Sequence, residues 1–427
     1  MMEIATLYNL FLQHPSIQTD TRKLKKGDLF FALKGDNFNG NLFSKQALQL
    51  GAAYAIIDEA VDFEDDRLIT TTDVLKTLQQ LAKYHRQQFT IPFLAITGSN
   101  GKTTTKELVN EVLATIYKTY TTKGNLNNHI GIPLTILSVK KDADIAVIEM
   151  GANHQKEIEG YCMYTLPTHG IITNCGKAHL EGFGGVEGVK KGKGELFDYL
   201  RKNNGTAFIM NDYDYLVEMS KGLPFVKTYG TVDAAIVGLA DANKQMLEVT
   251  MIKGIGIQEI HTNLVGAYNL PNVLVAVAVG KYFNVPDEKI KMALENYVPS
   301  NSRSQLMEQD SNKIILDAYN ANPTSMKAAI ENIAAMQNSQ KVLLLGGMME
   351  LGAESIAEHT AIINLINQYQ WKAVVLVGGN FNIITHPYIY FENAAEAKHW
   401  LQQQHFENSI FLVKGSRSMQ MEKVLEL

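Results

Sequence analysis

The stretch IPFLAI (91–96) followed by TGSNGKTTT (97–105) decides the class of the fold. The mainly apolar residues before the turn predict a strand, and a polar turn with two glycines then leads into a helix. Such a turn lets backbone N–H groups approach phosphate oxygens, and the N-terminus of the helix adds a favourable dipole. Lys102 can reach the terminal phosphates of a nucleotide, and Thr103 can offer its hydroxyl to Mg²⁺.

The glycines of this loop stand closer together than the usual pattern requires. G-x-x-x-x-G-K-[ST] is not met, because Gly98 and Gly101 are only three positions apart. The alternative is a helix start with chance glycine and threonine residues. The order of strand, turn and helix favours a phosphate site. Its predicted members are Gly98, Ser99, Asn100, Gly101, Lys102, Thr103 and Thr104.

The sequence on both sides of this loop predicts an α/β protein with three domains, at 1–90, 91–300 and 301–427. Apolar strands at 143–151, 169–176 and 205–212 alternate with helical stretches, which indicates a parallel sheet covered on both faces. The stretch 230–265 predicts an antiparallel hairpin appendage. The first domain mixes short strands and helices. The last contains four apolar strands, which predicts a second open sheet of the Rossmann-like kind.

Charge and composition exclude several classes of protein. The chain of 427 residues carries 39 Lys and Arg against 44 Asp and Glu, a net charge of −5, so no basic surface for nucleic acid is expected. Two cysteines cannot form a disulfide framework or a zinc quartet. The most apolar run, 270–280, is shorter than the roughly 20 residues that a membrane span needs. We expect a cytoplasmic protein without membrane insertion.

Single polar residues follow several of the predicted strands. Glu149 ends one strand, where it could bind Mg²⁺ directly or through water, although a solvated acid is the alternative. His179 lies on a glycine-rich loop at the same predicted edge, where metal or phosphate contact competes with a structural or exposed histidine. Three lysines in KKGKGELF (190–197) fall near the start of a predicted helix. A solvated, basic helix start is the favoured interpretation of this run.

Other polar groups admit two interpretations each. Asn269 and Asn272 could meet a purine edge, but asparagine is also a common N-cap. Asp317, Tyr319, Asn320 and Asn322 cluster after a strand, where a turn is the alternative. Lys414, Ser416 and Arg417 at another strand end suit a carboxylate or phosphate. Near the N-terminus, the residues compatible with an anionic ligand, or equally with hairpin turns, are Thr21, Arg22, Lys34, Asn37 and Asn39.

The order of the motifs resembles the Mur ligases, the ATP-dependent amide ligases of peptidoglycan precursor synthesis. The segments in question are TGSNGKTTTKE, GNLNNHIGIPLT, EMGANHQKEI, AHLEGFGGVEGVKKGKGE and GAYNLPNV. The shortened loop is that family's form. TDTRKLKKGDLFFALKGDNFNG, DAYNANPTSMKAAI and VKGSRSMQME resemble the members that add D-alanyl-D-alanine to UDP-N-acetylmuramoyl-tripeptide. The resemblance implies an N-terminal domain for the uridine nucleotide, a central ATPase-type domain and a Rossmann-like C-terminal domain.

The resemblance also implies a role for each matching residue. Lys102 and Thr103 would bind the β- and γ-phosphates and a first Mg²⁺, which Glu149 would share. His179 and a carbamylated Lys193 would hold a second Mg²⁺, with Lys190 and Lys191 as alternatives to Lys193. The remaining implied contacts are Asn269 and Asn272 to adenine, Arg303 and Asp317 to ribose and phosphates, Thr21, Arg22 and Lys34 to the uridine nucleotide, and Asn322 and Ser416 to the dipeptide.

Two segments depart from the family pattern. Gly347 stands where the family often has aspartate, and PSNSRSQ around Arg303 lacks the usual glycine before the arginine. Neither departure touches the metal or phosphate residues.

The predicted site residues indicate how ATP could drive the formation of an amide bond. A carboxylate is a poor electrophile, and phosphorylation by ATP converts it to an acyl phosphate that the amine of the dipeptide can attack. We expect a monomer. The competing hypotheses are another Mur step or a folylpolyglutamate-type ligase, a P-loop kinase or NTPase, and a non-catalytic nucleotide-binding protein.

Overall fold

The structure is a computed structural model that describes residues 2–241, 244–300, 302–338 and 340–425. The chain divides into two compact units. The first unit comprises residues 1–95, 117–151 and 157–169, and the second comprises 96–116, 152–156 and 170–427. The predicted division into domains at 90 and 300 stays a prediction.

The first unit begins with a small parallel sheet in the order β1-β2-β5-β6. Phe30, Ala55 and Ile57 point into its buried core together with Ala47 and Leu48 of a short helix. The sequence predicted the strand, helix, strand and helix of this region. The elements are α1 (Ile4–Gln13), β1 (Ile17–Gln18), β2 (Leu29–Phe31), β3 (Lys34–Gly35), β4 (Phe38–Asn39), α2 (Ser44–Gln49), β5 (Tyr54–Ile57), β6 (Leu68–Thr70) and α3 (Val74–Arg86).

The first unit also contains the strand that leads to the glycine-rich loop. Its strands follow the order β7-β9-β8, and β8 and β9 run parallel. All residues of β7 and β9 are buried, as the near-continuous apolar runs in the sequence predicted. The elements are β7 (Phe93–Thr97), β8 (Thr119–Thr121), α5 (Gly131–Leu137), β9 (Ile145–Glu149) and α6 (Glu157–Thr165).

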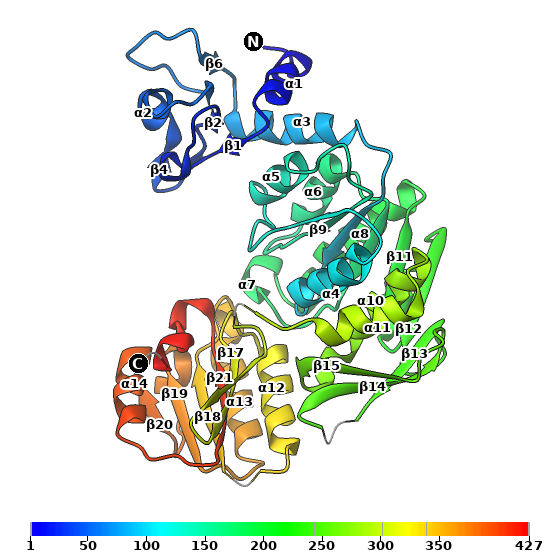
Figure 1. Ribbon diagram of the computed structural model, residues 1–427. Helices are drawn as coiled ribbons and strands as arrows, with labels where there is room; N and C mark the ends of the chain where they lie inside the picture. Colours follow the sequence, from blue (N-terminus) through cyan, green and yellow to red (C-terminus); the bar gives the residue numbers. More distant parts are fainter. Residues whose placement is uncertain (1, 242–243, 301, 339, 426–427) are drawn as a thin grey trace. The chain divides into compact units, whose positions relative to one another are not determined.

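The second unit contains α4 (Lys102–Ala114) and strands in the order β15-β14-β13-β12-β11-β10. Figure 1 labels α4 and the strands β11 to β15. The antiparallel pairing expected for 230–265 is confirmed for β13, β14 and β15. The expectation of an appendage is wrong, because β13 pairs in parallel with β12 and these strands extend the sheet. The elements are β10 (His169–Ile172), α7 (Leu180–Phe183), α8 (Val186–Lys202), β11 (Thr206–Met210), α9 (Asp214–Met219), β12 (Phe225–Gly230), β13 (Ile236–Ala240), β14 (Met246–Lys253), β15 (Glu259–Val265), α10 (Leu270–Tyr282) and α11 (Asp287–Asn296).

The C-terminal part of the second unit is the predicted open α/β sheet, in the order β16-β17-β21-β18-β19-β20. Four of its strands were predicted, and β16, antiparallel to β17, and β20 were not. The elements are β16 (Gln305–Gln309), β17 (Asn312–Asp317), α12 (Pro323–Ala335), β18 (Lys341–Gly346), α13 (Ser355–Ile366), β19 (Ala373–Val377), β20 (Ile389–Phe391), α14 (Ala394–Gln402) and β21 (Ile410–Lys414).

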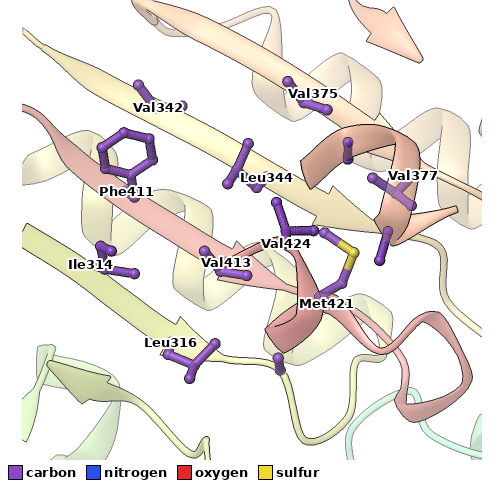
Figure 2. Close-up of a cluster of buried hydrophobic side chains, with 13 residues drawn as sticks. Ile314, Leu316, Val342, Leu344, Val375, Val377, Phe411, Val413, Met421 and Val424 are labelled. Atoms are coloured by element: carbon purple, nitrogen blue, oxygen red, sulfur yellow. The ribbon is translucent and has the colours of Figure 1, made fainter. Parts of the chain in front are cut away.

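Alternate residues of this sheet pack against α14 and the C-terminal turn. Figure 2 shows side chains at positions i and i+2 of β17, β18, β19 and β21, such as Val342 and Leu344, in one buried cluster with Met421 and Val424. The intervening Leu343 and Leu345 are also fully buried, so both faces of the sheet are covered. Burial of each such side chain contributes about 1.5–3 kcal/mol. This rigid layer carries the polar residues that follow the strand ends.

No helix among the residues that the structure describes is long and apolar enough to cross a membrane.

Candidate functional site: a phosphate loop and its polar surroundings

The loop before α4 requires glycine at two positions. Gly98 has φ +143° and Gly101 has φ +78°, in the region that L side chains rarely adopt. A Cβ at Gly98 would lie 2.0 Å from Thr173 Oγ1, and one at Gly101 would lie 2.6 Å from Asn272 Oδ1. Gly101 is the N-cap of α4 and offers no side chain to its first amides. The N-terminus of α4 therefore keeps the character of an anion site.

The segment that follows β10 holds the loop in place. Ser99 Oγ donates to the carbonyl of Gly176 at 2.8 Å, and the Asn100 N–H donates to Asn174 Oδ1 at 3.1 Å. The Lys102 ammonium donates to the carbonyls of Gly98 and Ser99, at 2.8 and 3.1 Å. The side chain of Lys102 thus folds back onto the phosphate loop. At the start of the helix, Thr103 is buried and Thr104 is half-buried.

The donors around this loop suit a polyphosphate. Asn100 Nδ2 is buried and has no hydrogen-bond partner in the described part of the chain. The ammonium of Lys102 and the backbone N–H groups at the start of α4 are further hydrogen-bond donors near it. A group of donors of this kind favours an anionic ligand. The residues present therefore fit the phosphates of ATP.

The two predicted adenine residues brace α10 against α4. Asn272 Oδ1 accepts from Thr105 Oγ1 at 3.0 Å, and Asn272 Nδ2 donates to Asn269 Oδ1 at 2.9 Å. Asn269 Nδ2 donates to the carbonyl of Val265 at 2.9 Å. Asn269 does occupy the N-cap position, but its side chain makes no capping bond. Both amides thus position the phosphate loop, and contact with adenine stays a prediction.

Lys193 is buried, contrary to the favoured interpretation of its segment. The helix α8 begins at Val186, so the lysine run lies within the helix and not at its start. Only 1% of Lys193 is exposed, its ammonium donates to the carbonyl of Ala152 at 3.0 Å, and it lies 4.8 Å from the centre of the Phe183 ring. The solvated interpretation holds for Lys191, which is exposed. Burial of a charge is costly, so Lys193 is a strong functional candidate.

His179 contacts a carboxylate that the sequence did not predict as a partner. It is the residue before α7, with φ +52°, and its Nδ1 contacts Glu350 Oε2. The hydrogen bond to His179 holds the pKa of the Glu350 carboxyl below its usual value. Glu350 lies 171 positions along the chain, so no local pattern could connect the two residues.

Arg303 and Asp317 are each engaged within the second unit. The Arg303 guanidinium lies 3.6 Å from the centre of the Tyr319 ring. Asp317 accepts from the Ser304 N–H at 3.1 Å and pairs with the ammonium of Lys414 at 2.6 Å. Lys414 is 2% exposed, so this ion pair lies in a poorly solvated position. The contacts of Arg303 and Asp317 to ribose and phosphates stay a prediction.

The two dipeptide candidates have structural tasks. Asn322 caps α12 by accepting from the Ser325 N–H at 3.0 Å, and its Nδ2 donates to Asn100 Oδ1 of the phosphate loop at 2.7 Å. Ser416 is buried and its Oγ accepts from the Met349 N–H at 3.0 Å. Asn322 is therefore placed beside the loop, whereas Ser416 supports the segment after β18.

Glu149 ends β9 in the first unit, as predicted. It is 1% exposed, and its Oε1 accepts from Asn127 Nδ2 at 2.8 Å. Thr122 Oγ1 accepts the backbone N–H of Glu149 at 2.9 Å. A solvated acid is therefore excluded, and a buried carboxylate oriented by an amide suits a hard cation. Asn127 was not among the predicted site residues, although it lies in the motif GNLNNHIGIPLT.

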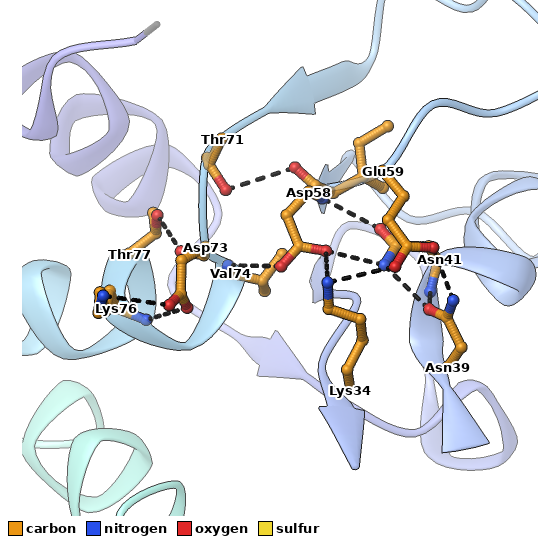
Figure 3. A network of polar contacts seen from close by, with 11 residues as sticks. Lys34, Asn39, Asn41, Asp58, Glu59, Thr71, Asp73, Val74, Lys76 and Thr77 are labelled. Carbon is orange, nitrogen blue, oxygen red and sulfur yellow. Dashed lines mark hydrogen bonds and ion pairs between the residues drawn. The ribbon is translucent and has the colours of Figure 1, made fainter. Parts of the chain in front are cut away.

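The uridine candidates also lie in the first unit. Lys34 pairs with Asp58 at 3.1 Å and Glu59 at 3.2 Å, and these carboxylates raise the pKa of its ammonium (Figure 3). Asn39 Nδ2 donates to Glu59 at 2.7 Å. Arg22 is exposed and pairs locally with Asp20 at 2.8 Å, just after Thr21. Hairpin and turn chemistry is thus present, and anion binding here stays a prediction.

Among the described residues, acidic and imidazole side chains alone do not make a complete metal site. Over the described residues, no group of three or more His, Cys, Asp and Glu side chains could hold a metal ion. The predicted ligands also include a threonine hydroxyl and a carbamylated lysine, which are not His, Cys, Asp or Glu side chains. The buried carboxylate of Glu149 and the imidazole of His179 fit Mg²⁺ only together with ligands of those other kinds.

Gly347, one of the two departures, lies in tight backbone packing. A Cβ there would be 2.5 Å from Gly379 Cα, so this chain has no space for an aspartate at that position. At the other departure, Ser302 and Ser304 on either side of Arg303 have positive φ.

The fold and the loop together define a nucleotide-dependent α/β enzyme, and comparison with known proteins gives its family. Three family models match: "Mur ligase family, catalytic domain" at residues 15–92, "Mur ligase middle domain" at 96–280, and "Mur ligase, glutamate ligase domain" at 302–417. The chain belongs to the Mur ligase family, and it is an ATP-dependent ligase.

Relatives and solved structures extend over nearly the whole chain. It is 34% identical to the UDP-N-acetylmuramoyl-tripeptide–D-alanyl-D-alanine ligases of Bacillus subtilis and Escherichia coli, with 96% of this chain and 92% of each relative covered. A crystal structure of MurF from Acinetobacter baumannii is 31% identical, with a TM-score of 0.89, and the match covers 96% of this chain and 92% of that one. The expected three-domain Mur ligase architecture is confirmed.

Proposed function

We propose that this chain joins D-alanyl-D-alanine to UDP-N-acetylmuramoyl-tripeptide at the expense of ATP, in peptidoglycan precursor synthesis. The products are ADP, phosphate and UDP-N-acetylmuramoyl-pentapeptide. Both curated relatives are named for this reaction and match at 34% identity. The observation that carries the proposal is the donor-lined loop at Gly98–Thr103, whose glycines cannot be replaced without collision.

The phosphate loop binds and orients the nucleotide. The N-terminus of α4 and Lys102 hold the β- and γ-phosphates, with Asn100 Nδ2 as a further donor. In this proposal Asn269 and Asn272 contact the adenine, and Arg303 and Asp317 contact the ribose and phosphates. Lys102 offsets the negative charge that develops on the phosphoryl group during its transfer. The transfer converts the tripeptide carboxylate into an acyl phosphate, which is the activated form.

The metal ligands form two proposed Mg²⁺ sites. Thr103 and Glu149 hold the first ion, and His179 and a carbamylated Lys193 hold the second. When bound, Mg²⁺ stabilises negative charge on phosphate oxygens. Carbamylation converts the buried ammonium of Lys193 into an anion that can bind a cation.

Two separate groups of side chains are proposed to bind the two substrates. Thr21, Arg22 and Lys34 bind the uridine nucleotide, and Asn322 and Ser416 contribute to the dipeptide site. The enzyme works as a cytoplasmic monomer. The amine of the dipeptide attacks the acyl phosphate, forms the new amide bond and releases phosphate.

The test measures phosphate release from ATP and Mg²⁺ with UDP-N-acetylmuramoyl-tripeptide, with and without D-alanyl-D-alanine. We expect release only with both substrates, and mass spectrometry should show the pentapeptide product. Release without the dipeptide would indicate another ligase or an NTPase. No turnover by a folded protein that binds ATP would indicate a binding protein.

Lys102→Ala tests the loop within the same assay. Loss of its charge should lower kcat by about 10²–10³-fold or more, as for other single donors to a transition state. The exposed Lys221→Ala is the matched control and should keep full activity. Full activity of a folded Lys102→Ala variant would contradict the loop assignment.

A further inference from the structure

The segment 347–350 after β18 is held by two hydrogen bonds to consecutive backbone amides. The Met348 N–H donates to His359 Nε2 at 3.0 Å, and the Met349 N–H donates to Ser416 Oγ at 3.0 Å. The next residue is Glu350, whose φ of +61° is unusual for a residue with a side chain. The surrounding contacts impose this conformation and so determine where the Glu350 carboxylate points.

The protonation of His359 follows from its partners. A backbone N–H can only donate, so Nε2 must be unprotonated, and the proton lies on Nδ1, which donates to the Ser355 carbonyl at 2.7 Å. His359 is fully buried and packs edge-on against Phe381, 4.7 Å between ring centres. A neutral, immobile imidazole thus anchors the segment that presents Glu350.

The segment around His179 is held by three further contacts. Lys177 pairs with Glu358 at 2.5 Å, and its N–H donates to Thr324 Oγ1 at 2.9 Å. The Glu181 N–H donates to the carbonyl of Glu350 at 3.4 Å. His179 and Glu350 therefore meet between two segments that are each fixed by further bonds.

In the neutral His179 ring, the contact with Glu350 favours a proton on Nδ1 over one on Nε2. Glu350 Oε2 lies against Nδ1, and a carboxylate can only accept. The Nδ1–H form leaves the lone pair of Nε2 for a cation. Histidines that bind metals commonly donate their other N–H to a carboxylate, which orients the ring and raises its basicity.

We propose that Glu350 is a positioning residue: it holds the His179 imidazole in the Nδ1–H tautomer and orients Nε2 for the Mg²⁺ of the ligation reaction. This inference rests on the proposed function. It also gives His359 and Ser416 a task, which is to hold the segment that carries Glu350.

The first test measures the tautomer of His179 directly, in the absence of metal and substrate. Two-dimensional ¹⁵N NMR of the full chain with labelled histidine, with His179 assigned through His179→Gln, should show protonated Nδ1 and unprotonated Nε2. In Glu350→Ala the signals should shift toward the Nε2–H form. Glu350→Gln keeps an oxygen acceptor and should restore the wild-type pattern. Glu354→Ala, an exposed acid four positions away, should change nothing.

The second test measures cation binding by Mn²⁺ titration with an unreactive ATP analogue. Glu350→Ala should bind Mn²⁺ about 10–100-fold more weakly than wild type, with Glu354→Ala unchanged. The Mg²⁺ concentration for half-maximal ligation should rise in parallel, while KM for D-alanyl-D-alanine stays the same. An unchanged tautomer or an unchanged Mn²⁺ affinity in Glu350→Ala would overturn the inference.

Different outcomes would overturn the role of Glu350 and the proposed function. Normal ligation that is impaired by His179→Gln and unaffected by Glu350→Ala overturns the inference alone. A wild-type chain that neither ligates nor binds Mn²⁺ overturns the proposed function and the inference together.

Discussion

At the scale of the single residue, His169 links burial to pH dependence. Burial lowers the pKa of its imidazole to about 4, whereas an unfolded chain has a histidine pKa near about 6.5. The folded state therefore favours the neutral ring. This stabilisation is complete above the unfolded pKa and is lost as the pH falls from about 6.5 toward 4.

We expect the unfolding free energy of the wild type to fall by about 2 kcal/mol more than that of His169→Gln between about pH 7.5 and about pH 5. Urea unfolding of both proteins at the two pH values measures the difference. The exposed His405→Gln is the control and should follow the wild type. Equal losses in all three proteins would show that His169 titrates normally.

At the scale of the element, the turn from β7 into α4 depends on Gly101. Alanine there would adopt a left-handed conformation at a cost of about 1–2 kcal/mol, and its Cβ would also meet Asn272 Oδ1. We expect Gly101→Ala to lower the unfolding free energy by at least this amount and to weaken ATP binding. Urea unfolding and nucleotide titration measure the two effects.

The same substitution elsewhere should have the opposite sign. Gly160 lies within α6, and a Cβ there would meet nothing within 4 Å. Gly160→Ala should stabilise the chain by about 0.5–1 kcal/mol through helix propensity. Destabilisation by both substitutions to a similar extent would contradict the role of the turn.

At the scale of the whole molecule, ligands should stabilise the two units unequally. The phosphate loop, Asn272 and Asp317 belong to the second unit, whereas Lys34 and Arg22 belong to the first. An unreactive ATP analogue at about 100 times its Kd should add about 2.7 kcal/mol of unfolding free energy. Hydrogen exchange should assign this gain to the second unit, and the gain from UDP-N-acetylmuramoyl-tripeptide to the first.

Lys102→Ala serves as the control for this experiment. At the same analogue concentration it should lose most of the stabilisation of the second unit and keep the response of the first unit to the uridine substrate. Equal stabilisation of both units by the nucleotide alone would contradict the assignment of its contacts to the second unit.

The sequence by itself determined the local features. The phosphate loop, the start of α4, the strands β7, β9 and β10 and the polar residues after them all follow from hydrophobic periodicity and turn chemistry, which act over a few residues. Glu149 and His179 could be predicted because each follows or ends a strand that the sequence predicts. The resemblance of ordered motifs then indicated the family, which the comparisons confirm.

Only the tertiary structure decided which distant residues meet. The burial of Lys193, the pairs Asp317–Lys414 and His179–Glu350, and the addition of β13, β14 and β15 to the sheet have no local signature. The partners in these pairs are 97 and 171 positions apart. Periodicity shows which face of an element is apolar, but the packing of whole elements selects the neighbour that each polar side chain finds.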